Sequence, residues 1–303
     1  KINETYAFLK CEDRGIAQEI VDYFSFFMPG YQFTPKYRAK IWDGKLRLAK
    51  ILPNGDIEFF IGLLHQLDHF AKDRNYTITK RFSEKPNNVS EQELLSFIDK
   101  LNVHSNDKKI EVRDYQYKGV LDFINKKRLT LLSPTSSGKS LVLYCIIRYL
   151  LANGKKKGLL LVPNTSLCYQ LFSDFQDYSS HNGWEVNDHI HSIYAGQDKN
   201  ADKQLYISTW QSLSNIKLRS YFDQFDFVLC DESHLASGAE ITSILNKCVN
   251  ADYRAGVTGT LNGKKIHGLQ LESLFGPVQK IITTKELMDR KQVTELAIRC
   301  VVL

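Results

Sequence analysis

One loop near the middle of the chain constrains the fold more than any other feature of the sequence. Residues 133–140 read Ser-Pro-Thr-Ser-Ser-Gly-Lys-Ser, after an apolar run at 129–132 and before a helical segment at 141–151. In a strand–loop–helix unit of this kind, the N–H groups and the positive dipole end at the helix start favour a bound anion. The pattern therefore predicts a phosphate-binding loop at one edge of a sheet.

Individual residues of this loop have expected roles. Lys139 is expected to reach the β- and γ-phosphates of a nucleotide, and the Ser140 hydroxyl is expected to bind Mg²⁺. The residues before them are expected to surround the phosphates: Pro134, Thr135, Ser136, Ser137 and Gly138. Ser133 stands where the strict pattern has a glycine, so the loop alone is weak evidence and needs a second motif beside it.

That second motif begins 92 residues after Lys139, at Asp231 (231 minus 139). The apolar segment 227–230 is followed by two adjacent carboxylates, Asp231 and Glu232. At the carboxyl edge of a parallel sheet, Asp231 is expected to hold Mg²⁺, and Glu232 to orient and deprotonate the attacking water. A surface Asp-Glu pair is common after any strand, but together with the loop it predicts a site for a nucleoside triphosphate and Mg²⁺.

Composition narrows the class of protein. The chain has 303 residues, enough for about two domains, and its 40 basic and 34 acidic residues give a formal charge of +6. This mild excess permits a nucleic-acid partner without requiring one. The six cysteines form no C-x-x-C pair, so we expect reduced thiols and no zinc site. No long apolar stretch or signal-peptide pattern is present, so we expect a cytoplasmic protein with no membrane partner.

The part of the chain that contains both motifs has a regular alternation of strands and helices. Strands are expected at 158–162, 205–209 and 253–258, and helices at 165–178 and 239–249. The alternation predicts an α/β fold with a doubly wound parallel sheet and helices on both faces.

We expect three parts along the chain. Residues 1–82 are predicted to form a small α+β nucleic-acid-binding domain. Residues 83–108, rich in Asn, Ser, Glu and Lys, are predicted to be a linker with one helix at 91–101. Residues 109–303 are predicted to form the α/β domain that binds the nucleotide.

The first part has a basic and aromatic segment of its own. Residues 31–50 contain six basic residues and one acidic residue, Asp43, interleaved with aromatic side chains. Cations can contact phosphates and aromatic rings can stack on bases, which makes these residues candidates for nucleic-acid contact: Lys36, Arg38, Lys40, Lys45 and Arg47. We expect a hairpin with Asp43-Gly44 at its turn, and a helix end at 22–27 packed against it. The alternative is a solvated strand face with Phe33 and Trp42 in the core.

Taken together, the motifs at 110–262 resemble those of the first RecA-like domain of superfamily 2 helicases. In that family, residues such as Arg113-Asp114-Tyr115-Gln116 precede the phosphate loop and recognise adenine. The resemblance implies that the nucleotide is ATP, that Gln116 hydrogen-bonds the adenine edge, and that Arg113 lies against its ring. It also explains Ser133, because this superfamily often replaces the initial glycine of the loop with another small residue.

Four motifs carry the same resemblance. The segments at 162–167 and 207–212 resemble motifs that contact one nucleic-acid strand, which implies such contacts for Pro163, Asn164, Thr165, Thr209, Trp210 and Gln211. Asp231-Glu232-Ser233-His234 is a DExH-type motif, in which His234 links the nucleotide site to the motif at 257–260. Taken singly, each has a simpler interpretation: a strand end, a turn, or a loop histidine with ordinary partners.

Segments in both parts of the chain are similar to the UvsW-type helicases of T-even phages. The similarity is carried by residues 30–38 and 42–48, by Phe275-Gly276-Pro277, and by residues 292–296. It implies an ATP-dependent DNA helicase that acts on branched DNA in recombination, repair and rescue of stalled forks. For a phage protein, it also implies the cytoplasm of the host cell.

A helicase of this superfamily needs a second RecA-like domain, whose arginines complete the ATP site. Only 43 residues follow residue 260, and they predict one helix at 283–290 and one strand at 293–303. We therefore expect a fragment that binds nucleotide and DNA but has little or no ATP turnover, with the second domain elsewhere in the full-length protein. Two alternatives stay open, a duplex DNA translocase of the restriction-motor kind and a non-catalytic DNA-binding module.

Overall fold

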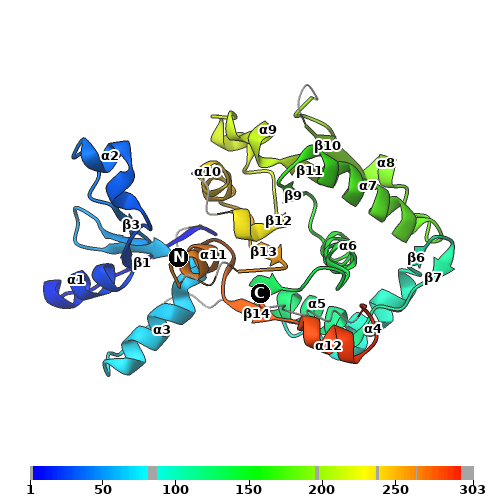
Figure 1. Ribbon diagram of the computed structural model, residues 1–303, viewed down its shortest axis with the longest axis horizontal. Helices are drawn as coiled ribbons and strands as arrows, with labels where there is room; N and C mark the ends of the chain where they lie inside the picture. The colour runs from blue at the N-terminus through cyan, green and yellow to red at the C-terminus, as the bar shows by residue number, and fades with distance from the viewer. Residues whose placement is uncertain are drawn as a thin grey trace, which may run out of the picture.

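The computed structural model describes residues 3–80, 87–194, 198–236, 239–261, 263 and 265–294. We call residues 3–80 the N-terminal lobe and the described residues from 87 onward the body. The two lie side by side, with the N-terminal lobe at the left of Figure 1 and α11 (Lys265–Phe275) of the body next to it.

The body is built on a seven-stranded sheet in the order β10-β11-β9-β12-β13-β8-β14. All six neighbouring pairs are parallel. The strands are β8 (Arg128–Leu132), β9 (Gly158–Val162), β10 (Ile190–Ile193), β11 (Leu205–Thr209), β12 (Phe227–Cys230), β13 (Tyr253–Thr258) and β14 (Val278–Lys280). The predicted RecA-like α/β fold class is therefore confirmed.

Alternate residues of each buried strand point to opposite faces of the sheet. Both faces are therefore apolar, and helices cover both. In β9, Leu160 and Val162 join one core cluster, while Leu159 and Leu161 join the other. The first face is covered by α4 (Glu91–Lys100), α5 (Asp114–Lys126), α6 (Lys139–Ala152) and α7 (Thr165–Ser179). The second is covered by α9 (Trp210–Ser214), α10 (Ala239–Lys247) and α11.

The segment predicted as a linker contributes to the core of the body. Its helix α4 begins at Glu91 as expected, with Ser90 as its N-cap. Leu94 and Ile98 of this helix are buried in the same cluster as α5 and α6. A two-stranded hairpin follows, formed by β6 (His104–Ser105) and β7 (Lys108–Lys109). The division of the chain at residues 82 and 108 stays a prediction.

The N-terminal lobe is a small α+β unit. Its sheet has the order β1-β5-β4, with β1 (Tyr6–Leu9), β5 (Ile57–Phe60) and β4 (Ala49–Ile51) all antiparallel. Helices α1 (Arg14–Tyr23) and α3 (Leu64–Asp73) supply the other side of its core.

The expected hairpin around Asp43-Gly44 is wrong. Residues Pro35–Arg38 form a short helix, α2, because Thr34 caps its N-terminus and Pro35 occupies its first turn. Strand β3 (Lys45–Arg47) instead pairs antiparallel with β2 (Ser25–Phe27). The expected helix end at 22–27 is therefore also wrong, since α1 ends at Tyr23 and a strand follows.

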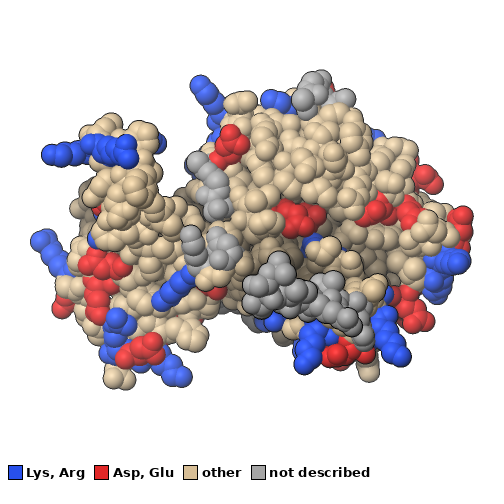
Figure 2. Space-filling model, viewed as in Figure 1, with Lys and Arg blue, Asp and Glu red and all other residues tan. Residues whose placement is uncertain are grey.

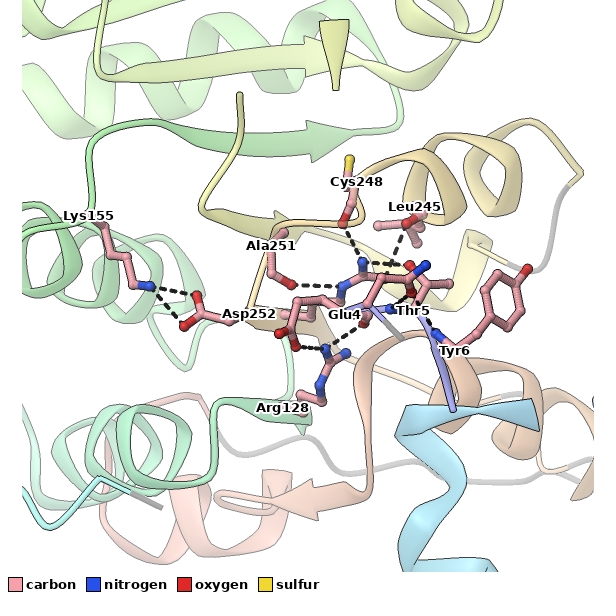
Figure 3. A network of polar contacts seen from close by, with 11 residues as sticks. Glu4, Thr5, Tyr6, Arg128, Lys155, Leu245, Cys248, Ala251 and Asp252 are labelled. Atoms are coloured by element: carbon pink, nitrogen blue, oxygen red, sulfur yellow. Dashed lines mark hydrogen bonds and ion pairs between the residues drawn. The ribbon is translucent and has the colours of Figure 1, made fainter. Parts of the chain in front are cut away.

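Buried polar contacts join the two lobes (Figure 3). Arg254 of β13 is 1% exposed and donates to the hydroxyl of Thr5 at 2.9 Å and to the carbonyl oxygens of Leu245 and Ala251. Arg128 of β8 forms a 2.8 Å ion pair with Glu4. These contacts anchor the start of β1 to the edge of the body.

The end of the chain is described only in part. Helix α12 (Thr284–Asp289) confirms the helix predicted at 283–290, with Thr283 and Glu286 forming a capping box. Of the strand expected at 293–303, Val293 and Thr294 have no strand structure, and the rest lies outside the described residues. Within the described residues, no helix is long and apolar enough to span a membrane.

Candidate nucleotide site

Three neighbouring strands bring the predicted motifs to one edge of the sheet. β13 lies between β12 and β8, and the register places Thr258 beside Leu132 and Gly256 beside Cys230. The N–H of Ser133 donates to the carbonyl oxygen of Thr258 at 2.8 Å. Because the strands are parallel, the phosphate loop, the DExH motif and the motif at 257–260 all begin at this edge.

Hydrogen bonds between the small residues of the phosphate loop stabilise its compact conformation. The Ser137 hydroxyl lies 2.6 Å from the Pro134 carbonyl oxygen and 2.5 Å from the Ser133 hydroxyl. Ser136 and Gly138 have left-handed backbone, with φ of 64° and 79°. Gly138 has a second constraint, since a Cβ there would lie 2.3 Å from Nε2 of Gln116. Glycine is therefore required where the loop enters α6.

Lys139 and the DExH motif face each other across this edge. Nζ of Lys139 lies 3.8 Å from a carboxylate oxygen of Glu232, and the two side chains are 13% and 29% exposed. The other Glu232 oxygen lies 3.3 Å from Nδ1 of His234, which is also 2.9 Å from the Thr258 hydroxyl. The structure thus brings the cation, the carboxylate and the histidine of the prediction together.

Asp231 is the most strongly perturbed carboxylate of the site. It follows the end of β12, is 6% exposed, and accepts a hydrogen bond from the N–H of Glu232 at 2.9 Å. Burial raises its pKa to about 6, with further contributions from the carboxylates of Glu232 and Asp174, while Lys139 acts in the opposite direction. A buried carboxylate of this kind gains from a nearby cation.

Ser140 has two partners that the sequence analysis missed. Its hydroxyl lies 2.9 Å from that of Tyr178 on α7. Asp174, one turn earlier on α7, also hydrogen-bonds Ser140, and burial raises the pKa of its carboxyl. The sequence could have indicated these partners through the i, i+4 spacing of Asp174 and Tyr178, which puts both side chains on one face of the predicted helix.

The donor set around Ser140 and Asp231 fits a Mg²⁺ ion bound with a nucleotide. Both groups offer oxygen atoms, and burial, which raises the pKa of Asp231, disfavours a carboxylate charge that a cation would offset. In the described part of the chain, no group of three or more His, Cys, Asp or Glu residues could hold a metal ion. Mg²⁺ at such sites needs only one or two protein ligands besides phosphates and water.

Gln116 and Arg113 lie at the start of α5, against the phosphate loop. The Gln116 amide is 3% exposed, accepts from the N–H of Arg113 at 2.9 Å and donates to the Ser137 carbonyl at 2.8 Å. The Arg113 guanidinium contacts the Tyr115 hydroxyl and the side chain of Gln292. Gln116 therefore braces the loop, and its contact with adenine stays a prediction.

The residues predicted to contact a nucleic-acid strand lie at the same carboxyl edge. Val162 and Thr209 end neighbouring strands and are paired in register. Asn164 caps α7 by accepting from the N–H of Leu167, and Thr209 caps α9 by accepting from that of Ser212. Asn164 and Gln211 are exposed, whereas Pro163, Thr165 and Trp210 are half-buried. Their contact with nucleic acid stays a prediction.

The basic segment of the N-terminal lobe is exposed, with Lys and Arg side chains gathered at the tip of the lobe over α2 (Figure 2). Lys36, Arg38 and Lys40 are exposed, and Lys45 is half-buried. Arg47 forms an ion pair with Asp43 and, with the Lys45 backbone N–H, lowers the pKa of that carboxyl to about 2. The alternative that places Phe33 in the core is wrong, because its side chain is 74% exposed.

Comparisons with known proteins agree with this arrangement. Residues 109–263 match the family model described as the res subunit of type III restriction enzymes, and residues 3–80 match that described as the N-terminal part of DNA helicase UvsW. The ATP-dependent DNA helicase UvsW of enterobacteria phage T4 is 33% identical over 306 residues, which cover 97% of this chain and 58% of the relative. The chain thus spans little more than half the length of that relative.

Solved structures give the same result. A crystal structure of the UvsW helicase from bacteriophage T4 is 30% identical, with a TM-score of 0.80 over 92% of this chain and 97% of that one. A second T4 UvsW structure, also 30% identical, has a TM-score of 0.81 over 94% of this chain and 56% of that one. The chain belongs to the superfamily 2 DExH helicases, in the family of the type III restriction res subunit, and is of the UvsW type.

Proposed function

We propose that this chain is the ATP-binding and DNA-binding part of an ATP-dependent DNA helicase. One observation carries the proposal: Lys139 and Glu232, 93 positions apart in sequence (232 minus 139), lie 3.8 Å apart beside the buried Asp231. A lysine, a hydroxyl and two carboxylates around a helix N-terminus are the groups that phosphoryl transfer requires.

In this proposal each group of the site has one task. Lys139 and the loop N–H groups bind the phosphates, and Ser140 and Asp231 hold Mg²⁺. The ion, when bound, neutralises charge on the β- and γ-phosphates. Glu232 positions the attacking water and accepts its proton. His234 connects Glu232 with Thr258, and so connects the nucleotide site with the motif at 257–260.

We propose branched DNA as the substrate and recombination, repair and stalled-fork rescue in the host cytoplasm as the setting. The support is the 33% identity with T4 UvsW, together with the exposed basic tip of the N-terminal lobe. Because the chain spans 58% of that relative, we further propose a second RecA-like domain in the full-length protein. Its arginines would speed hydrolysis by roughly 10³–10⁵-fold, so the chain alone should bind ATP with little or no turnover.

Substitution of Lys139 tests the nucleotide site. Lys139→Ala removes a charged contact to phosphate, which contributes about 1.5–3 kcal/mol, so we expect affinity for Mg-ATP to fall by about 10- to 150-fold. Titration of a fluorescent ATP analogue measures this, with Lys285→Ala on the exposed surface of α12 as the charge-matched control. Equal affinity of Lys139→Ala and the wild-type chain would exclude the proposed site.

A duplex DNA translocase is the second candidate, favoured by the match of residues 109–263 to a restriction-enzyme subunit. Both candidates use the same ATP site and differ in what happens to the strands. Strand-displacement and triplex-displacement assays on the full-length protein separate them. A translocase displaces a third strand from a duplex without separating the duplex itself.

A further inference from the structure

The sheet of the N-terminal lobe has one face that its own core does not cover. Along β1 and β5, alternate residues point to opposite sides, and Ala7, Ile57 and Phe59 face the lobe's core. Tyr6, Phe8 and Phe60 line the other side. The rings of Tyr6 and Phe60 are 4.9 Å apart, and Phe60 is half-buried against the cores of both the lobe and the body, whereas Phe8 is 40% exposed. An open sheet face with aromatic rings on adjacent strands is a surface on which flat rings can stack.

This face forms one wall of a cleft between the N-terminal lobe and the body, where a recess separates the two in Figure 2. The cleft has a volume of about 1120 Å³, and residues of α10 and α11 form its opposite wall. Four cations line it, Lys45, Arg47, Arg219 and Lys247, of which Arg47 is paired with Asp43, against a single acidic residue. That residue, Glu58, is already paired with Lys50 at 2.8 Å.

We propose that this cleft binds an unpaired strand of DNA. Stacked base pairs cover their own faces, so exposed aromatic rings favour bases that are not paired in a duplex, and the surrounding cations favour their phosphates. This cleft is separate from the carboxyl edge of the sheet, where Asn164 and Thr209 are expected to contact a strand. The inference rests on the proposed function, to which it adds a second strand-binding site.

Fluorescence anisotropy with an oligothymidylate of about 12 nucleotides tests the site on the 303-residue chain. A crystallised T4 UvsW chain of matching extent shows that this portion of such a protein can be prepared. Loss of stacking on one ring lowers affinity by about 5- to 150-fold, which we expect for Phe8→Ala. Phe8→Leu keeps the apolar bulk of the side chain and should also weaken binding, because it has no aromatic face.

Two matched controls stand outside the cleft. Leu95 on α4 is 44% exposed, close to the 40% of Phe8, so Leu95→Ala removes an exposed apolar side chain without touching the cleft lining. Arg219, by contrast, is an exposed residue of the cleft lining. Arg219→Ala should remove one phosphate contact, which reduces the slope of log affinity against log salt concentration by about 0.7. Lys285→Ala on α12 should leave this slope unchanged.

Photo-crosslinking locates the bound strand directly. An oligothymidylate with 5-iodouracil should crosslink to the tryptic peptide that ends at Lys10 and contains Tyr6 and Phe8. If affinity for the single strand is the same in Phe8→Ala and Phe8→Leu as in Leu95→Ala, and the crosslinks map elsewhere, this inference is overturned while DNA binding by the chain stands. If neither single-stranded nor duplex DNA binds, the DNA-binding part of the proposed function fails as well.

Discussion

At the scale of single residues, Asp231 occupies a position that destabilises the protein when no nucleotide is bound. Its carboxyl titrates near pH 3.8 when exposed, but burial beside Glu232 and Asp174 raises its pKa to about 6. Between these two values the unfolded chain releases a proton that the folded chain retains, so stability falls as the pH rises through this window. Above pH 6 the full penalty of about 3 kcal/mol is present.

Replacement of this carboxylate should therefore stabilise the folded chain, while it removes the proposed ligand of Mg²⁺. Asp231→Asn can keep the hydrogen bond from the Glu232 N–H but carries no charge. We expect it to raise the free energy of unfolding by about 1–3 kcal/mol at pH 7.5, with the gain vanishing toward pH 4. Denaturant titrations at both pH values measure the effect, and Asp202→Asn, at a fully exposed carboxylate, is the control. A pH-independent gain would contradict the argument.

At the scale of elements, the sequence was sufficient to predict the strands that are buried on both faces of the sheet. Strands β9, β11 and β13 begin and end where the sequence predicts them, because each is a segment of five or six residues that carries apolar side chains and is too short for a buried helix. The predicted hairpin is wrong because Thr34-Pro35, a helix cap followed by a proline, starts a short helix in the segment that was expected to be its first strand. The pairing of β3 with β2 is nonlocal, and no pattern in either segment specifies it.

Helix α11 has a role that no sequence motif indicated. His267 on this helix is 7% exposed, and its Nε2 lies 2.6 Å from the carbonyl oxygen of His234. On the same helix, Leu269 packs into the core of the N-terminal lobe, and Glu272 accepts a hydrogen bond from the side chain of Gln66. One helix thus contacts both the DExH motif and the lobe.

Substitution of His267 tests whether this contact positions the DExH motif. His267→Leu removes the donor to the His234 carbonyl, so the loop that carries Glu232 loses a fixed contact. We expect affinity for Mg-ATP to fall by about 3- to 10-fold, since ordering the loop then opposes binding. His267→Gln retains an N–H donor and should restore most of the affinity. If both variants bind like wild type while remaining folded, the contact does not position the motif.

At the scale of the whole molecule, the arrangement of the two lobes depends on contacts that are far apart in sequence. The Arg254–Thr5 and Arg128–Glu4 pairs each join residues more than 120 positions apart. Neither Arg254 nor Arg128 belongs to a recognisable motif, and nothing in the sequence distinguishes a buried arginine on a strand from an exposed one. The RecA-like fold of the body could be predicted from local patterns, whereas the strand pairing of β2 with β3 and the cleft between the lobes could not.

Gly62 offers a test of the close approach between the lobes. A Cβ at this position would lie 2.1 Å from the carbonyl oxygen of Glu272 on α11, which is backbone and cannot move aside alone. Gly62→Ala should therefore push the N-terminal lobe away from α11 and lower the free energy of unfolding by about 1–3 kcal/mol. Gly268→Ala on α11 is the matched control, because its Cβ would meet no atom within 4 Å and should stabilise the helix by about 0.5–1 kcal/mol. Denaturant titration measures both, and hydrogen exchange should increase in α11 and around residue 62 only in Gly62→Ala. Equal stability of the two variants would mean that the lobes do not pack at this point.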